Sequence, residues 1–217
     1  HSGPPPMGIQ IADIAGGSLH SVIGILAAVI ERQRSGLGQY IDISMTDCVV
    51  GLSSMAAAAS LAGQEKQGPE QSYLNGATFY DYYETQDGRY LSIGSLEPQF
   101  LHGLAQILEL PIVAEKGASL ATEDRQVVKQ AIKDKIKTQD FATWNAIFQQ
   151  QDVCVEPVLK LDEALDSQLA KDRAWVVSGP LQEGSTKSEQ QLACPIKFSR
   201  SKIRYEFIGK PLGFDFL

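Results

Sequence analysis

An acidic residue followed by paired glycines is the most informative chemical feature of the sequence. Asp13 lies within an apolar stretch, and Gly16 and Gly17 follow it just before a run of helical spacing. Glycines let a backbone approach a ligand closely, and the first N–H groups of a helix are unpaired. This pattern predicts a site in which those N–H groups hold a developing oxyanion while the carboxylate acts on the same substrate. The alternative is that Asp13 only caps the start of the helix.

Two further segments could contribute to a site. Glu97-Pro98 follows an expected strand and precedes an expected helix, where the helix dipole favours an anion. The alternative for Glu97 is an ordinary capping acid. Asn75 and Gly76 indicate a tight loop, after which Tyr80 and its aromatic neighbours could line an acyl pocket. The alternative for these aromatics is packing in the core of a hairpin.

Composition excludes several classes of function. The 217 residues carry 19 Lys and Arg against 26 Asp and Glu, a net charge of −7, so a basic nucleic-acid-binding surface is not expected. The three cysteines lie far apart and no metal-ligand spacing occurs, so we expect neither a disulfide scaffold nor a metal site. A reducing, cytoplasmic compartment is the simplest interpretation.

The apolar N-terminal stretch, residues 9–30, is not predicted to span a membrane. Its uninterrupted apolar part covers residues 22–30, which is too short to cross a bilayer. The chain opens with His1 and shows no signal peptide. We therefore expect no membrane contact and interpret the sequence as a piece of a longer protein.

The elements that would position these residues fall into two parts. Near the N-terminus, periodicity predicts a helix over about 18–34 that is buried on nearly all sides, a half-buried strand over 39–44, and a helix over about 46–62. Helix, strand and helix in this order suggest an α/β layer. A polar segment, 63–72, resembles a linker.

The second part predicts an α+β unit. An Asp-Gly turn should join strands 80–85 and 90–94 in a hairpin. Short strands are expected at 155–159 and 175–177, and the tail from 178 to 217 should be extended or loosely ordered. The expected helices cover 98–108, 122–137, 140–150 and 161–170.

Several motifs in matching order give the sequence a strong resemblance to the family III CoA-transferases, the CaiB/BaiF type. The resemblance is carried by residues 11–18, 24–28, 31–32 and 35–42. The racemase branch of that family is the best match, on residues 82–84, 87–90, 94–100 and 152–159.

The resemblance implies roles for the candidate residues. Asp13 matches the family's catalytic aspartate, which exchanges a proton with the α-carbon of an acyl-CoA in the racemases and becomes acylated in the transferases. Glu97 matches a glutamate that supports a catalytic histidine, which the resemblance places upstream of residue 1. Residues expected to contact the substrate or its CoA are Gly16, Gly17, Asn75, Gly76 and Tyr80. Coenzyme A enters only as part of the thioester substrate, and no cofactor or metal is implied.

The resemblance also implies an architecture and an activity. Residues 1–66 would be the end of a Rossmann-like large domain, 67–72 a linker, 73–177 a small α+β domain, and 178–217 a tail returning toward the large domain. Full-length members form homodimers. The implied activity is racemisation of 2-methylacyl-CoA thioesters in lipid metabolism. Two alternatives remain open: transfer of CoA between carboxylic acids, and a non-catalytic domain.

Overall fold

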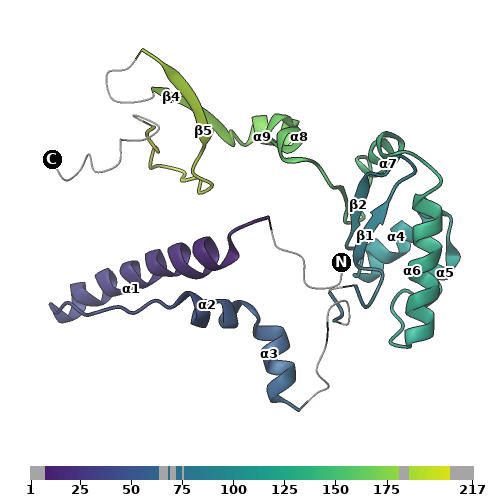
Figure 1. Cartoon of the computed structure of the whole chain (residues 1–217), viewed down its shortest axis with the longest axis horizontal. Helices are drawn as coiled ribbons and strands as arrows, with labels where there is room; N and C mark the ends of the chain where they lie inside the picture. The colour runs from purple at the N-terminus through teal and green to yellow at the C-terminus, as the bar shows by residue number, and fades with distance from the viewer. Residues whose placement is uncertain (1–7, 64–67, 69–71, 75, 181–185, 206–217) are drawn as a thin grey trace. The chain divides into compact units, whose positions relative to one another are not determined.

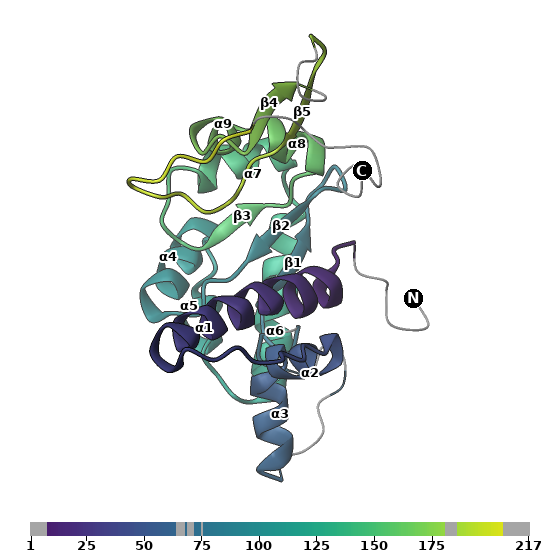
Figure 2. The ribbon, with the colours of Figure 1, turned by 90° about the vertical axis from the view of Figure 1, so that its left-hand side faces the viewer.

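The computed structural model describes residues 8–63, 68, 72–74, 76–180 and 186–205, and the chain divides into two compact units. The first unit covers residues 1–76 and the second covers 77–217. Among the described residues the first unit is built of helices, whereas the second combines helices with two small antiparallel sheets (Figure 1, Figure 2). The chain is therefore a mixture of helix and sheet, as the sequence predicts.

The long N-terminal helix begins earlier than predicted. A π-helical segment, η1 (Ile11–Leu19), leads directly into α1 (His20–Ser35). The helix ends at Gly36, which has a left-handed φ of 76° and donates its N–H to the carbonyl of Arg32 at 2.8 Å. Glycine adopts this conformation without steric cost, so the predicted end of the helix is confirmed.

The expected strand over 39–44 is not formed. Residues 36–44 are an irregular extended segment that lies along α1. A Cβ on Gly24 would lie 3.3 Å from side-chain atoms of both Ile41 and Ile43, so this glycine lets the segment pack closely on the helix. A strand needs a hydrogen-bonded neighbour, and the described residues of the first unit contain no other strand.

The second predicted helix is divided in two. Helices α2 (Met45–Leu52) and α3 (Ser54–Leu61) meet at Ser53. The Ser53 hydroxyl donates to the carbonyl of Val49 at 3.2 Å, a local bond that competes with regular helix geometry. The Oγ of Ser44 accepts a hydrogen bond from the N–H of Asp47 at 3.3 Å and caps α2.

The apolar side chains of α1 remain exposed, which contradicts the predicted burial. Ile23 is 62% exposed and none of the residues in α1 is buried, although the irregular segment packs on the helix at Gly24. The continuous helix Ile11–Ser35 contains an 18-residue window with a mean hydropathy of 1.7, so by length and composition it could span a membrane. The short uninterrupted apolar run therefore does not exclude a span by length, and the expectation of no membrane contact stays a prediction. Core helices and signal sequences meet the same criterion, so the helix alone assigns no membrane location.

The predicted hairpin forms in the second unit. Strands β1 (Asp81–Glu84) and β2 (Tyr90–Ile93) pair antiparallel, and β3 (Val155–Pro157) pairs antiparallel with the other edge of β2. Gly88 in the connecting turn has a φ of 79°, as an Asp-Gly turn requires. Alternate residues of β2 point into the core, so that Leu91 and Ile93 are buried.

In the described part of the second unit, four helices accompany this sheet, and one of them was not predicted. The predicted ends of three are confirmed to within two residues, whereas the six-residue helix α5 was missed. Buried positions in α4 recur at Leu101, Leu104, Ala105 and Leu108, the spacing of an amphipathic helix. The helices are α4 (Pro98–Leu108), α5 (Pro111–Lys116), α6 (Thr122–Ile136) and α7 (Phe141–Phe148).

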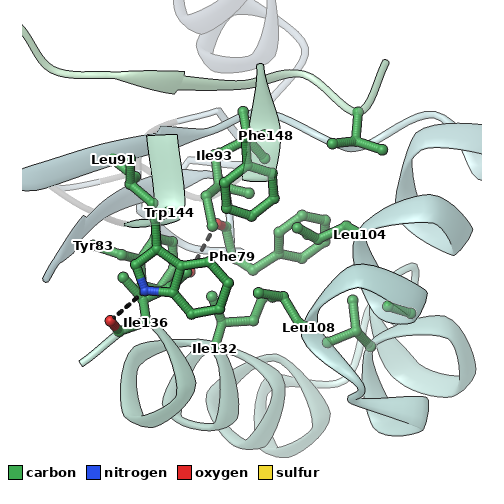
Figure 3. Packing of buried hydrophobic residues seen from close by; sticks show 14 of the residues in the cluster. Phe79, Tyr83, Leu91, Ile93, Leu104, Leu108, Ile132, Ile136, Trp144 and Phe148 are labelled. Carbon is green, nitrogen blue, oxygen red and sulfur yellow. Dashed lines mark hydrogen bonds between the residues drawn. The ribbon is translucent and has the colours of Figure 1, made fainter. Parts of the chain in front are cut away.

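The core of the second unit lies between the sheet and these helices (Figure 3). Leu91, Leu104 and Ile132 are fully buried, and Trp144 is 1% exposed. The indole N–H of Trp144 donates to the carbonyl of Ile136 at 2.8 Å, so the ring fills the core without leaving its donor unpaired. This core fixes β2 and α4, between which Glu97 lies.

The C-terminal part differs from prediction in two places. The helix expected over 161–170 is divided into α8 (Leu161–Asp166) and α9 (Gln168–Asp172), because Ser167 is extended and its Oγ accepts the N–H of Ala170. In the tail, β5 (Ser188–Leu192) pairs antiparallel with β4 (Val176–Pro180). The pairing supplies the order that the sequence of the tail does not indicate.

Candidate functional site

Asp13 lies in the first turn of η1. The segment has the wide spacing of a π-helix, and two side chains bond across five residues: the Ser18 hydroxyl donates to the Asp13 carbonyl at 3.1 Å, and Nδ1 of His20 lies 2.6 Å from the Ala15 carbonyl. The side chain of Asp13 is exposed, at the end of the helix whose dipole favours a negative charge.

Gly16 and Gly17 have a packing role that the sequence did not reveal. A Cβ on Gly16 would lie 3.2 Å from the carbonyl oxygen of Met45, and one on Gly17 would lie 3.4 Å from the Met45 side chain. Both glycines therefore let the start of α2 approach η1, and Gly16 is buried there.

The helix start corrects the predicted oxyanion site. Because the helical segment begins at Ile11, Gly16 and Gly17 lie inside it, beyond the unpaired N–H groups of its first turn. The N–H groups of these glycines are therefore not the free donors that the sequence suggests. At this helix end the N–H groups of Ile11 and Ile14 are also paired, because they donate to the carbonyls of Ile9 and Gln10 at 3.1 and 2.9 Å.

The loop candidates are only partly described. Asn75 lies outside the described residues. Gly76 has a φ of 79° and forms an isolated bridge with Ser72, consistent with a tight loop. A role for either residue in substrate binding stays a prediction.

Glu97 occupies the N-cap position of α4, yet it does not cap the helix with its side chain. Pro98 takes the first helical position and Glu97 has extended backbone angles, φ −69° and ψ 143°. Its carboxylate makes no capping hydrogen bond and joins no ion pair among the described residues. The ordinary capping alternative is therefore wrong for this side chain, which is exposed and available to another group.

Tyr80 lies against the strand end that leads to Glu97. A Cβ on Gly94 would be 3.2 Å from Cε2 of Tyr80, so the absence of a side chain at Gly94 makes room for the ring. Tyr80 is 37% exposed, and its ring is neither in the core cluster nor fully solvated. The second unit thus brings Tyr80 against Gly94, three residues before Glu97, while Asp13, Gly16 and Gly17 are grouped in the first unit.

Cys154 is a neighbour of Glu97 that sequence reasoning missed. Partial desolvation of the thiol, with the carboxylates of Glu97, Asp152 and Glu156, raises the pKa of this otherwise exposed residue. A thiol with a raised pKa is protonated at neutral pH and is a poor nucleophile. Cys154 has a left-handed φ of 51°, a backbone conformation that is uncommon for residues other than glycine and is therefore not expected from the sequence.

The cavities in the described part of the chain lie away from the candidate residues, and no group of metal ligands is found there. Two cavities of about 450 and 650 Å³ share Leu165 and Leu192, between α8 and the β4–β5 hairpin. Neither includes a predicted site residue. No cluster of three or more His, Cys, Asp or Glu side chains suited to a metal ion occurs among the described residues.

Comparison with known proteins identifies the family of this chain and two of its relatives. The profile of CoA-transferase family III matches residues 1–215. Mouse α-methylacyl-CoA racemase is 38% identical over 175 residues, which are 80% of this chain and 45% of the racemase. Mouse succinyl-CoA:glutarate CoA-transferase is 26% identical over 165 residues, 74% of this chain and 37% of the transferase. The chain thus spans less than half the length of either relative.

A solved structure reproduces the fold. A CAIB/BAIF family protein from Brucella suis superposes with a TM-score of 0.71 and 23% sequence identity, covering 96% of this chain and 54% of that protein. At this identity the likeness concerns the fold alone.

Proposed function

Because the chain belongs to CoA-transferase family III, we propose that the protein containing it racemises 2-methylacyl-CoA thioesters at the α-carbon. The observation that carries the proposal is the identity with mouse α-methylacyl-CoA racemase, which exceeds the identity with the mouse CoA-transferase. The free carboxylate of Glu97 adds support, since it leaves that group available to a catalytic partner.

The proposed reaction is a proton transfer in two steps. A thioester α-hydrogen is weakly acidic, so its removal needs a positioned base and stabilisation of the enolate. Asp13 takes the proton from one face, and the electron pair of the broken C–H bond moves onto the thioester oxygen. A second acid returns a proton to the other face and reforms the C–H bond. No redox chemistry is involved, and coenzyme A takes part only as the thioester of the substrate.

The proposal assigns the second acid to none of this chain's own histidines, because the family resemblance places the catalytic histidine upstream of residue 1. Nδ1 of His20 is engaged with the carbonyl of Ala15, and Nε2 of His102 lies 3.1 Å from the side-chain amide of Gln106 on the same helix. In the proposal, a histidine from beyond residues 1–217 acts on the second face. Glu97 beside it would favour its protonated form.

The exposure of Asp13 sets a condition on the proposal. The side chain faces solvent and lines none of the cavities described for this chain. The proposal therefore requires the substrate and further protein to cover it. We include in the proposal that residues 1–66 complete a Rossmann-like large domain and that the whole protein is a homodimer.

Two alternatives have specific support. In a CoA-transferase, the Asp13 carboxylate would attack the thioester carbonyl and release CoA thiolate, giving an acyl-aspartyl anhydride. The thiolate would then attack the aspartyl carbonyl and expel the first carboxylate, so that Asp13 carries CoA as a thioester until a second carboxylic acid takes it by the reverse steps. The match to the mouse CoA-transferase favours this reaction. In a non-catalytic domain Asp13 would have no reactive role, and its exposure favours that possibility.

Solvent isotope incorporation separates these possibilities. The assay uses a protein that carries this sequence at the length of its relatives, one enantiomer of a 2-methylacyl-CoA, and D₂O. Racemisation predicts gain of one deuterium at the α-carbon without transfer of CoA to added succinate. Transfer of CoA to succinate would support the CoA-transferase. The absence of both deuterium incorporation and CoA transfer would support the non-catalytic domain.

A matched pair of variants then tests Asp13. Asp13→Asn should slow deuterium incorporation by about 100-fold or more, the scale of a lost general base. Asp47→Asn is the control, because Asp47 is another exposed acid in the first turn of a helix of the same unit. Equal rates for Asp13→Asn and the unaltered protein would remove Asp13 from the mechanism.

A further inference from the structure

We propose that Ser95 and Cys154 are positioning residues that fix the Glu97 carboxylate, through the backbone of residues 153–154. The inference rests on the proposed function, because it concerns the same site. Neither residue is expected to touch the substrate. Their role is to hold the four-residue connection between β2 and α4, called here the Glu97 loop (residues 94–97), in one place.

Ser95 fastens the Glu97 loop from inside. Its side chain is fully buried, and its hydroxyl donates to the carbonyl of Val153. A buried hydroxyl is retained at low cost only when it is paired, and its removal leaves the partner carbonyl unpaired. The Ser95 hydroxyl therefore ties the loop to a single position on residue 153.

Cys154 fastens the same loop through its backbone. Its carbonyl accepts the N–H of Gly94 at 2.9 Å, and the next residue, Val155, begins β3 beside Ile93. The left-handed φ of 51° at Cys154 directs the chain from this contact into the strand. A non-glycine residue in this conformation is strained and persists only where its surroundings impose it.

The support beneath residue 153 is also tight. A Cβ on Gly103 of α4 would lie 2.7 Å from Cγ1 of Val153, so the helix and the 153–154 segment are in direct contact. The N–H of Leu101 in turn donates to the carbonyl of Glu97 at 2.9 Å. Glu97 is therefore held from both sides: by the first turn of α4 and by the loop that Ser95 and Cys154 anchor.

The side chain of Glu97 depends on this backbone support, because it has none of its own. No hydrogen bond or ion pair holds the carboxylate among the described residues. A shift of the loop by a fraction of an ångström would move the carboxylate without unfolding the unit. Misplacement of about 1 Å can cost on the order of 100-fold in rate.

The test compares variants of the protein at the length of its relatives in the α-proton exchange assay. Ser95→Ala should lower kcat about 10-fold with KM changed less than about twofold. The pH profile should shift in the same direction as in Glu97→Gln, since both weaken the effect of one carboxylate on its acid partner. Ser92→Ala is the control: it makes the same change on β2, where the hydroxyl has no partner among the described residues.

Cys154 is tested by a pair of substitutions that separates backbone from thiol. Cys154→Gly removes the thiol but accepts a positive φ, so activity should remain within about twofold. Cys154→Val resists that conformation and should lower kcat as Ser95→Ala does. The reverse order, with Cys154→Gly impaired and Cys154→Val active, would overturn the assignment.

The outcomes distinguish this inference from the proposed function. Loss of exchange in Glu97→Gln together with full activity in both Ser95→Ala and Cys154→Val would refute the positioning role and leave the function standing. Full exchange in Glu97→Gln would refute the role of Glu97, and the positioning inference with it. A fall in kcat without a shifted pH profile would show a general structural effect and would also refute the inference.

Discussion

Replacing Gly103 with alanine should strain the contact that supports the Glu97 loop. The added methyl group would lie 2.7 Å from Cγ1 of Val153, closer than real side-chain carbons approach. Val153 is 5% exposed and β-branched, so it cannot easily turn aside. The atoms must therefore move apart at the cost of packing elsewhere.

The magnitude follows from two opposing effects. Overpacking of a core costs about 1–3 kcal/mol. Alanine is favoured over glycine inside a helix by about 0.5–1 kcal/mol. We therefore expect Gly103→Ala to lower the free energy of unfolding of the second unit by about 1 kcal/mol. Urea titration followed by the fluorescence of the buried Trp144 measures this change.

A double-mutant cycle tests the cause. Val153→Ala alone should destabilise the unit by about 1–3 kcal/mol, because it leaves a cavity. In the double variant the methyl group added by Gly103→Ala enters that space, so the two changes together should cost about 1 kcal/mol less than their sum. Additive free energies, or greater stability in the Gly103→Ala variant, would refute the reasoning from this contact.

Three other predictions concern separate features. Trp144→Phe should lower the free energy of unfolding by about 1–3 kcal/mol, measured by circular dichroism, because the buried Ile136 carbonyl loses its short indole donor and keeps only the 3.5 Å bond from the N–H of Gln139. Hydrogen bonds from the Thr85 hydroxyl and the Phe141 N–H lower the pKa of Asp87, so its stabilisation is complete above the pKa of the unfolded chain and is lost as pH falls through the lower folded value. As pH is lowered from about 5 to 2, the urea midpoint should therefore fall less steeply in Asp87→Asn than in the unaltered protein. Equal slopes would contradict a contribution of Asp87 to the acid dependence of stability. The 217-residue chain alone should show negligible α-proton exchange, and measurable turnover would disprove the need for a histidine from outside it.

Local sequence signals predicted most of the second unit. The Asp-Gly turn, the alternation of β2 and the Glu97-Pro98 helix start each act through neighbouring residues, so the hairpin and α4 were predictable. The start of the first helix was mistaken because Gly16 and Gly17 look like a helix boundary. In the structure they instead admit α2 against η1, a contact that depends on Met45 and its neighbours, far along the chain.

Candidate site residues could be chosen by type and order, but their environment could not. The sequence identified Asp13 and Glu97 and left open whether each was merely a cap. Only the structure separates the Glu97 side chain from a capping role, and only it reveals Ser95 and Cys154 as neighbours of the loop. Cys154 stands out by its positive φ, and a cysteine in the sequence does not predict that backbone conformation.

The amino-acid sequence by itself determined the family, the mixed helix-and-sheet class and the residues that could do chemistry, because these follow from residue order and short-range periodicity. The tertiary structure decided which groups are free, buried or strained. Those properties arise when segments distant in sequence meet, as residues 94–97 meet residues 153–154. Burial, unlike periodicity, depends on the segments that pack against an element. The described residues of the first unit leave the apolar side chains of α1 exposed.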